Sequence, residues 1–169
     1  MANCCLYTMK AVAKDEDTLK RLLQIMRQED SEYYIYRCQD VSLDKSYQED
    51  GLCVYELQGD VAWSANHWIG RDEITTPDHT LENGAHYVTL DLLAERLGFA
   101  CEIYTEEPGN QFQEWILCDR YGTAMNDTVD WCENWEDEDG NELDEPTYEG
   151  GFDDYCQFKS ARELWNYKF

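Results

Sequence analysis

Apolar and polar residues alternate at the start of the chain and predict a strand over residues 2–13. Every second position from Cys5 to Ala13 is apolar, so we expect this face to point at the core. A helix should follow, because Asp15 is a good N-cap residue and apolar residues recur at helical spacing from Leu19 to Met26.

The pattern beyond this helix predicts further strands and a second helix. Turn signals at Glu49-Asp50-Gly51 and at Glu107-Pro108-Gly109-Asn110 separate the segments. Gly98 is placed to end the second helix. We expect strands over residues 33–42, 52–64, 99–105 and 112–120, the second helix over residues 89–97, and a loop from His67 to His86 that contains Gly70, Pro77, Asn83 and Gly84.

The resulting order, β-α-β-β-α-β plus one more strand, is typical of the ferredoxin-like fold. We therefore predict an α+β core over residues 1–120, in which an antiparallel sheet carries two helices on one face. Residues 121–169 should form an acidic, β-rich extension packed on the same domain. In it we expect a strand near 123–133, a turn at Asp139-Gly140-Asn141, an extended return near 152–158 and a short closing helix capped by Ser160 and Glu163.

The chain is strongly acidic. Its 37 acidic and 13 basic residues give a net charge of −24, which repels nucleic acid and anionic membrane surfaces and attracts basic proteins. A second interpretation stays open, in which the charge serves only to keep the protein soluble.

Residues 121–158 contain many acids and no Lys or Arg. A protein that competes with nucleic acid for a basic groove needs rows of carboxylates, and rigid aromatic anchors supply affinity. This stretch offers both, because Trp and Tyr residues are interleaved with its acids. The candidate partner-binding residues are Asp130, Glu133, Trp135, Glu136, Asp137, Glu138, Asp139, Glu142, Asp144, Glu145, Tyr148, Glu149, Asp153 and Asp154.

Two other interpretations apply to the same stretch. It could be a solvated acidic loop whose aromatic residues pack back on the sheet. It could also bind calcium, because the run from Asp137 to Gly140 is similar to part of an EF-hand loop. That register would place Trp135 and Pro146 at ligand positions, so the EF-hand match fails, and only loose binding of a divalent ion remains.

Zinc and enzyme chemistry have little support in the sequence. There is no Cys-x-x-Cys motif, no nucleophile elbow and no glycine-rich phosphate loop. The stretch from Trp63 to Arg71 could line a pocket, although anchoring of a long loop explains it better. The three histidines, His67, His79 and His86, lie in that predicted loop. We therefore expect no enzymatic activity, no cofactor and no metal ion.

The eight cysteines mostly fall in apolar alternating segments. We interpret most of them as small buried hydrophobic residues with reduced thiols. The residues from Met1 to Cys5 are unlike a signal peptide, and no apolar run approaches the roughly 20 residues of a membrane span. These features predict a cytoplasmic protein that does not contact a membrane.

A family resemblance adds to this picture. Residues 97–109 end in Glu106-Glu107-Pro108-Gly109 and are followed by Phe112 and a strand-like segment at 114–118. Together with the amino-terminal strand, this segment resembles the ferredoxin-like domain of the Api92-like family of phages, plasmids and integrative elements. The resemblance covers residues 1–125. It implies a mobile-element origin and a bacterial host cell, and it carries no catalytic residues to transfer.

The sequence thus favours a non-enzymatic inhibitor of the anti-CRISPR or DNA-mimic type. Its partner would be a basic nucleic-acid-binding host protein, such as a CRISPR effector or a similar defence nuclease. It would not bind nucleic acid directly. Two alternatives remain open: an accessory binding module without mimicry, and a divalent-metal-dependent enzyme.

Overall fold

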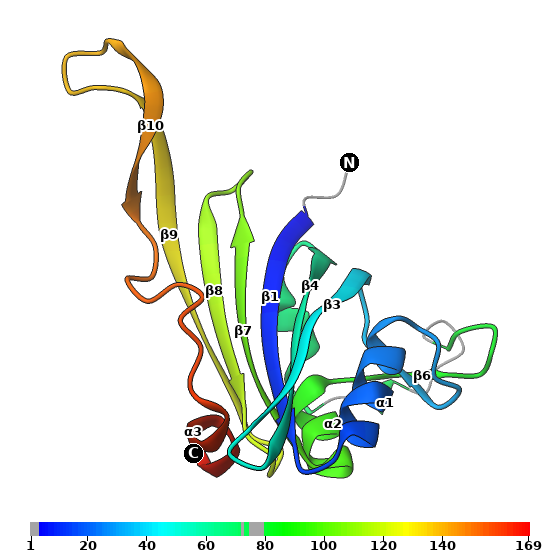
Figure 1. The fold of residues 1–169 in the computed structure, drawn as a ribbon. Coiled ribbons are helices and arrows are strands. Elements are labelled where there is room, and N and C mark those ends of the chain that lie inside the picture. The colour runs from blue at the N-terminus through cyan, green and yellow to red at the C-terminus, as the bar shows by residue number, and fades with distance from the viewer. Residues whose placement is uncertain (1–3, 72, 75–79) are drawn as a thin grey trace.

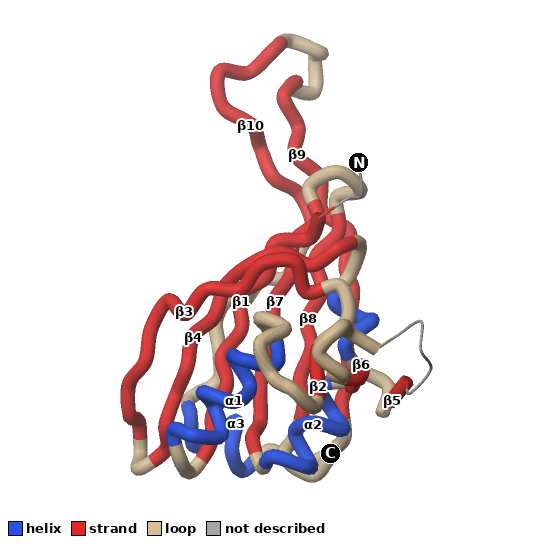
Figure 2. The backbone as a smooth tube through the Cα atoms, turned by 90° about the vertical axis from the view of Figure 1, so that its right-hand side faces the viewer, coloured by secondary structure: helices blue, strands red, loops and turns tan. Residues whose placement is uncertain are grey.

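The computed structural model describes residues 4–71, 73–74 and 80–169, which build one large antiparallel sheet. Its strand order is β10-β9-β8-β7-β1-β4-β3, and the sheet curls into an open half-barrel (Figures 1 and 2). The strands are β1 (Cys4–Ala13), β3 (Cys38–Glu49), β4 (Leu52–Ala62), β7 (Phe99–Glu107), β8 (Phe112–Cys118), β9 (Ala124–Glu136) and β10 (Glu142–Gly150).

Different helices cover the two faces of this sheet. Helices α1 (Glu16–Met26) and α2 (Leu90–Leu97) lie on one face and bury their leucines against the side of β1 that carries Met9. Helix α3 (Ala161–Asn166) lies on the opposite face, where Leu164 packs with Val12 and neighbouring residues. The central strands β1 and β7 are therefore buried on both sides over most of their length, whereas β3 and β9 are largely exposed.

A second, three-stranded sheet lies beside α1 and α2. It contains β2 (Tyr33–Tyr34), β6 (His86–Val88) and β5 (Glu73–Ile74), and β2 and β6 are parallel. The 3-10 helix η1 (Ala65–Trp68) comes between β2 and β5 in the chain. The predicted loop from His67 to His86 is interrupted by the end of η1, by β5 and by the first residue of β6, and its other described residues lie in no helix or strand. Pro77 and His79 lie outside the described residues.

Several local predictions are confirmed. The β1 residues predicted to face the core are buried from Cys5 to Ala13 at every second position. The Asp15 side chain accepts a hydrogen bond from the Thr18 N–H at 2.9 Å and begins α1. At α3 the Ser160 hydroxyl and the Glu163 carboxylate form the predicted capping box. Alternation and cap chemistry are local signals, so they do not depend on the tertiary fold.

The predicted ferredoxin-like α+β fold is wrong. Strands β8, β9 and β10 continue the same sheet beyond β7, giving a curled seven-stranded sheet, and a third helix covers the opposite face. The physical reason is that an exposed strand edge offers unpaired N–H and C=O groups. Strand β8, which the prediction assigned to the core, satisfies the edge of β7. The residues assigned to the extension then satisfy the edges of β8 and β9, as strands β9 and β10.

The single strand predicted over residues 33–42 is also wrong, because residues 35–37 interrupt it and separate two strands. Residues 33–34 belong to the small sheet and β3 begins at Cys38, after Arg37 adopts a φ of 60°. The register of β3 on β4 shifts between Cys38 and Asp40. A Cβ on the facing Gly59 would overlap the Asp40 carbonyl oxygen, so only glycine permits this approach.

All eight cysteines are free thiols in the structure. The prediction that most of them are buried is wrong, because only half are. Burial raises the pKa of Cys5 to about 12 and that of Cys38 to about 11, so these thiols are held in the neutral form. The buried cysteines are Cys5, Cys38, Cys101 and Cys118.

No helix in the described part of the chain is long and apolar enough to cross a membrane.

Candidate functional site

The outer part of β9, the following turn and β10 form a hairpin that projects from the sheet. β9 pairs with β8 as far as Asp130 and from Trp131 onward pairs only with β10. In Figure 1 this pair extends well beyond the ends of the other strands. We call residues 130–150 the acidic hairpin. Because only its inner end rests on the body, both of its faces are open to a partner.

The hairpin holds most of the residues predicted to bind a partner. Those residues are exposed, except for Glu133, which is half-buried. The members on the hairpin are Asp130, Glu133, Trp135, Glu136, Asp137, Glu138, Asp139, Glu142, Asp144, Glu145, Tyr148 and Glu149. Asp153 and Asp154 are exposed as well, but they lie in the segment that leads from the hairpin to α3.

The predicted extended return near 152–158 is wrong, because the returning strand is β10 at Glu142–Gly150. Residues 152–158 instead run along the body, where three aromatic rings pack around Tyr104 with centroid distances of 5.5 to 6.3 Å. Their aromatic character reflects packing on the sheet, not contact with a partner. The rings are Phe152, Tyr155 and Phe158.

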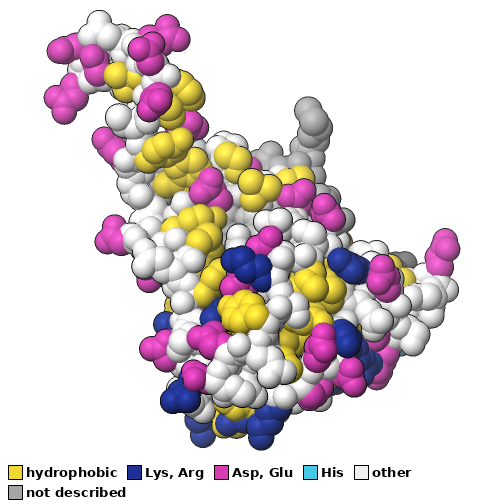
Figure 3. All heavy atoms as spheres, viewed as in Figure 1, with side chains coloured by type: hydrophobic (Ala, Val, Ile, Leu, Met, Phe, Trp, Pro, Cys, Tyr) yellow, Lys and Arg dark blue, Asp and Glu magenta, His cyan; other side chains and the backbone are white. Residues whose placement is uncertain are grey.

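The charges of the acidic hairpin are not neutralised by the protein itself. None of the ion pairs between described residues involves a carboxylate from residues 121–158. Acids on the body do have cations, as in the pairs Arg21–Asp30 and Arg162–Asp50. Figure 3 shows acidic side chains around the hairpin tip, and the Lys and Arg side chains visible in that view on the body.

Like charges also face each other across the hairpin. Glu136 of β9 and Glu142 of β10 are directly opposite in the register. Two carboxylates in this position repel each other and cost stability. A bound cation would relieve this repulsion, so the arrangement favours a positively charged partner.

The tip is a tight turn built on Asp137. Its carboxylate accepts hydrogen bonds from the backbone N–H groups of Asp139 and Asn141, at 2.9 and 2.8 Å, and from the Asn141 side chain. These hydrogen bonds, led by the one from the Asn141 side chain, lower the pKa of Asp137 below its ordinary value. Gly140 supplies the positive φ of 79° that the turn needs. Asp137 therefore shapes the turn, whereas its exposed neighbours are free to meet a partner.

The two faces of the hairpin differ in chemistry. Alternation along β9 puts Trp131, Glu133 and Trp135 on one face, and the register adds Tyr148 from β10. The rings of Trp131 and Tyr148 lie 6.0 Å apart. We call these four residues the aromatic face. The other face carries Cys132, Asn134, Glu136, Thr147 and Glu149 and contains no aromatic ring.

Buried carboxylates elsewhere have structural roles. Glu114 is 1% exposed and accepts hydrogen bonds from the Ala65 N–H at 3.0 Å, from the Thr105 hydroxyl at 2.8 Å and from the Ser64 hydroxyl. Glu102 likewise accepts from the Trp115 indole and from the Lys159 N–H. Sequence patterns do not distinguish such acids from solvated ones, because partners such as Ala65 and Lys159 lie far along the chain.

The Trp63–Arg71 stretch anchors the connection between the two sheets. Trp68 is fully buried, packs edge-on against Tyr7 at 5.0 Å and donates its indole N–H to the Tyr36 carbonyl. Arg71 pairs with Glu95 and donates to the Gly122 carbonyl at 2.6 Å. These contacts support the interpretation of this stretch as an anchor.

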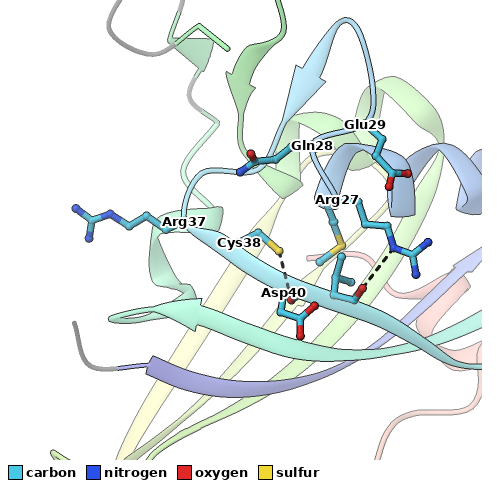
Figure 4. A pocket seen from close by; sticks show the side chains of 8 residues that line it. Arg27, Gln28, Glu29, Arg37, Cys38 and Asp40 are labelled. Atoms are coloured by element: carbon cyan, nitrogen blue, oxygen red, sulfur yellow. Dashed lines mark hydrogen bonds between the residues drawn. The ribbon is translucent and has the colours of Figure 1, made fainter. Parts of the chain in front are cut away.

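A cavity of about 680 Å³ lies between the end of α1 and β3 (Figure 4). Its lining includes Arg27, whose Nε–H donates to the Val41 carbonyl, and Asp40. Arg37 is also at its border but points away from the other side chains. The arrangement offers neither a nucleophile–base pair nor converging charges. No group of three or more His, Cys, Asp or Glu side chains in the described part of the chain is placed to hold a metal ion.

Comparisons with known proteins add no relative. No family model, no curated protein and no solved structure matches this chain. The resemblance to the Api92-like family therefore stays an expectation, and the functional argument depends on the chain's own geometry and charge.

Proposed function

We propose that this protein is a non-enzymatic inhibitor that docks its acidic hairpin onto the nucleic-acid-binding surface of a basic protein. The observation that carries the proposal is the projecting hairpin itself, whose exposed carboxylates have no ion pair with a described Lys or Arg. A defence nuclease such as a CRISPR effector is a suitable partner, because its guide and target channels are positively charged.

The shape of the hairpin supports this mode of binding. A groove that holds nucleic acid is lined with Lys and Arg at phosphate spacing. The hairpin is a narrow two-stranded ribbon that can enter such a groove, with carboxylates on both faces and on the turn. By occupying the groove it would exclude the nucleic acid, without any chemical step.

Affinity would come from two sources. Exposed carboxylates raise the association rate through long-range attraction and contribute less to the final affinity. The exposed rings of Trp135 and Tyr148 supply apolar contact area, which commonly dominates the energy of an interface. An acidic surface without such rings would associate quickly and also dissociate quickly.

A pull-down with purified CRISPR effector complexes tests the proposal. The full chain should retain an effector at about 50 mM salt and lose much of it at about 200 mM, because charge pairs between the two surfaces are screened. Added double-stranded DNA should release the effector from the chain. Failure to retain any effector, or retention that ignores both salt and DNA, would contradict the proposal.

A further inference from the structure

The aromatic face of the acidic hairpin places one carboxylate among three rings. On β9, Glu133 lies between Trp131 and Trp135, two residues away from each on the same face. Across the hairpin it is directly opposite Tyr148. Trp135 is 51% exposed and Tyr148 is 66% exposed, so their rings form the open sides of this arrangement.

Glu133 is the half-buried member of the predicted partner-binding set. It makes no ion pair with any Lys or Arg that the structure describes. A carboxylate beside aromatic rings is partly shielded from water, and an unpaired charge there costs more than one in bulk solvent. A cation that pairs with this carboxylate would therefore gain more binding free energy than a cation that pairs with an acid at the hairpin tip.

We propose that the aromatic face is an arginine-binding surface, which takes guanidinium groups from the basic partner. This inference rests on the proposed function and specifies which side chains of the partner the aromatic face binds. One guanidinium would pair with the Glu133 carboxylate and lie flat against the ring of Tyr148 or Trp135.

The chemistry selects arginine over lysine. A guanidinium is planar, weakly hydrated and able to form two parallel hydrogen bonds to one carboxylate while it stacks on a ring. A lysine ammonium is compact and strongly hydrated, so it loses more water when it approaches a ring. The positive group is attracted to the face of Trp most strongly and to that of Tyr as well.

The opposite face of the hairpin provides a matched comparison. Glu136 carries the same charge and lies only three residues from Glu133, but its face contains no aromatic ring. If charge alone recruits the partner, the two glutamates are equivalent. If the aromatic face reads arginine, only Glu133 contributes to the preference for arginine.

Titration calorimetry of the full chain with nona-arginine and nona-lysine peptides tests the inference. The two probes have the same charge, so general electrostatic attraction affects them equally. We expect the arginine peptide to bind about tenfold more tightly, which is within the range of cation–π contacts. The Trp135→Leu, Tyr148→Leu double variant and the Glu133→Gln variant should each lose this preference, whereas Glu136→Gln should keep it.

The outcomes separate the inference from the proposed function. Equal, salt-sensitive binding of both peptides, or equal loss of preference in Glu133→Gln and Glu136→Gln, would overturn the arginine-binding surface and leave the charge-based docking intact. Binding of neither peptide would overturn both. The comparison of two peptides on the unaltered chain does not depend on the folding of any variant.

Discussion

At the scale of single residues, acids in this protein fall into two groups that the sequence does not separate. Glu114 and Glu102 are buried and hold backbone and side-chain donors of distant segments. The hairpin acids are exposed, apart from the half-buried Glu133, and no described Lys or Arg pairs with them. The net charge of −24 includes both groups. Of these two groups, only the exposed hairpin acids can contact a partner, because the buried acids are occupied by hydrogen bonds inside the protein.

Removing Glu114 should strongly destabilise the fold. In Glu114→Ala, the Ala65 N–H and the hydroxyls of Ser64 and Thr105 lose their acceptor inside the protein. We expect a loss of about 3 kcal/mol in the free energy of unfolding, measured by urea denaturation. The exposed Asp127 on β9 gives a control, since Asp127→Ala should change stability by less than about 0.5 kcal/mol. Equal effects of the two variants would contradict the structural role of Glu114.

The hairpin turn should respond to pH through Asp137. Its pKa is lowered in the folded protein, so the carboxylate stabilises the turn at neutral pH and loses this effect as the pH falls through the lowered value. The backbone amide signals of Asp139 and Asn141 should shift together below the ordinary carboxyl value of 3.8. The Asp137→Asn variant should abolish that shared titration, and its persistence would show that another group controls the turn.

At the scale of elements, the hairpin contains a cross-strand pair of like charges, which destabilises a two-stranded ribbon. Glu136 and Glu142 face each other across the two strands. Repulsion of this kind lowers the stability of the free protein and is relieved when a cation binds. The pair is therefore consistent with a surface selected for binding instead of for hairpin stability.

Replacing Glu142 by lysine should stabilise the free hairpin and weaken docking. The Glu142→Lys variant converts a repulsive cross-strand pair into an attractive one, which we expect to add roughly 0.2–1 kcal/mol. Slower hydrogen exchange at the amides of β10 would report the gain. Affinity for a basic partner should fall in the same variant. A variant that stabilises the hairpin and also binds the basic partner more tightly would contradict the proposed role of these acids.

Element prediction from the sequence succeeded where local signals decide. The alternation in β1, the Asp15 cap of α1, Gly98 after α2 and the capping box of α3 are all confirmed. The break at Arg37 was missed, because a positive φ at a non-glycine residue leaves no pattern. The sequence predicts the returning strand over 152–158, because aromatic residues are common in strands and acidic residues are not. In the structure those aromatic rings pack on Tyr104, and the acid-rich segment Glu142–Gly150 forms the strand.

At the scale of the whole molecule, the sequence pattern does not predict which strands pair with one another. The order of elements suggested a small sheet with two helices, but the structure extends it through β8, β9 and β10 and places α3 on the other face. Alternation can indicate that a segment is a strand; it does not tell which edge that strand joins. The acidic character of residues 121–158 was visible in the sequence, and their projection as a hairpin became visible only in the structure (Figure 1).

The proposed binding depends on where the charge lies in the molecule, not on the total charge. Exposed acids also occur on the body, for example Asp17, Asp44 and Glu82. A variant in which these three become Asn, Asn and Gln loses as many charges as the hairpin variant Asp139→Asn, Glu142→Gln, Glu145→Gln. The two variants thus have equal net charge and differ only in where the charge was removed.

The decisive experiment is displacement of labelled DNA from a purified CRISPR effector by the unaltered chain and by these two variants. We expect the unaltered chain and the body variant to displace DNA at similar concentrations, while the hairpin variant needs a concentration several-fold higher, because each lost carboxylate removes a charge contact. Equal weakening of the two variants, or no displacement by the unaltered chain, would contradict docking through the acidic hairpin.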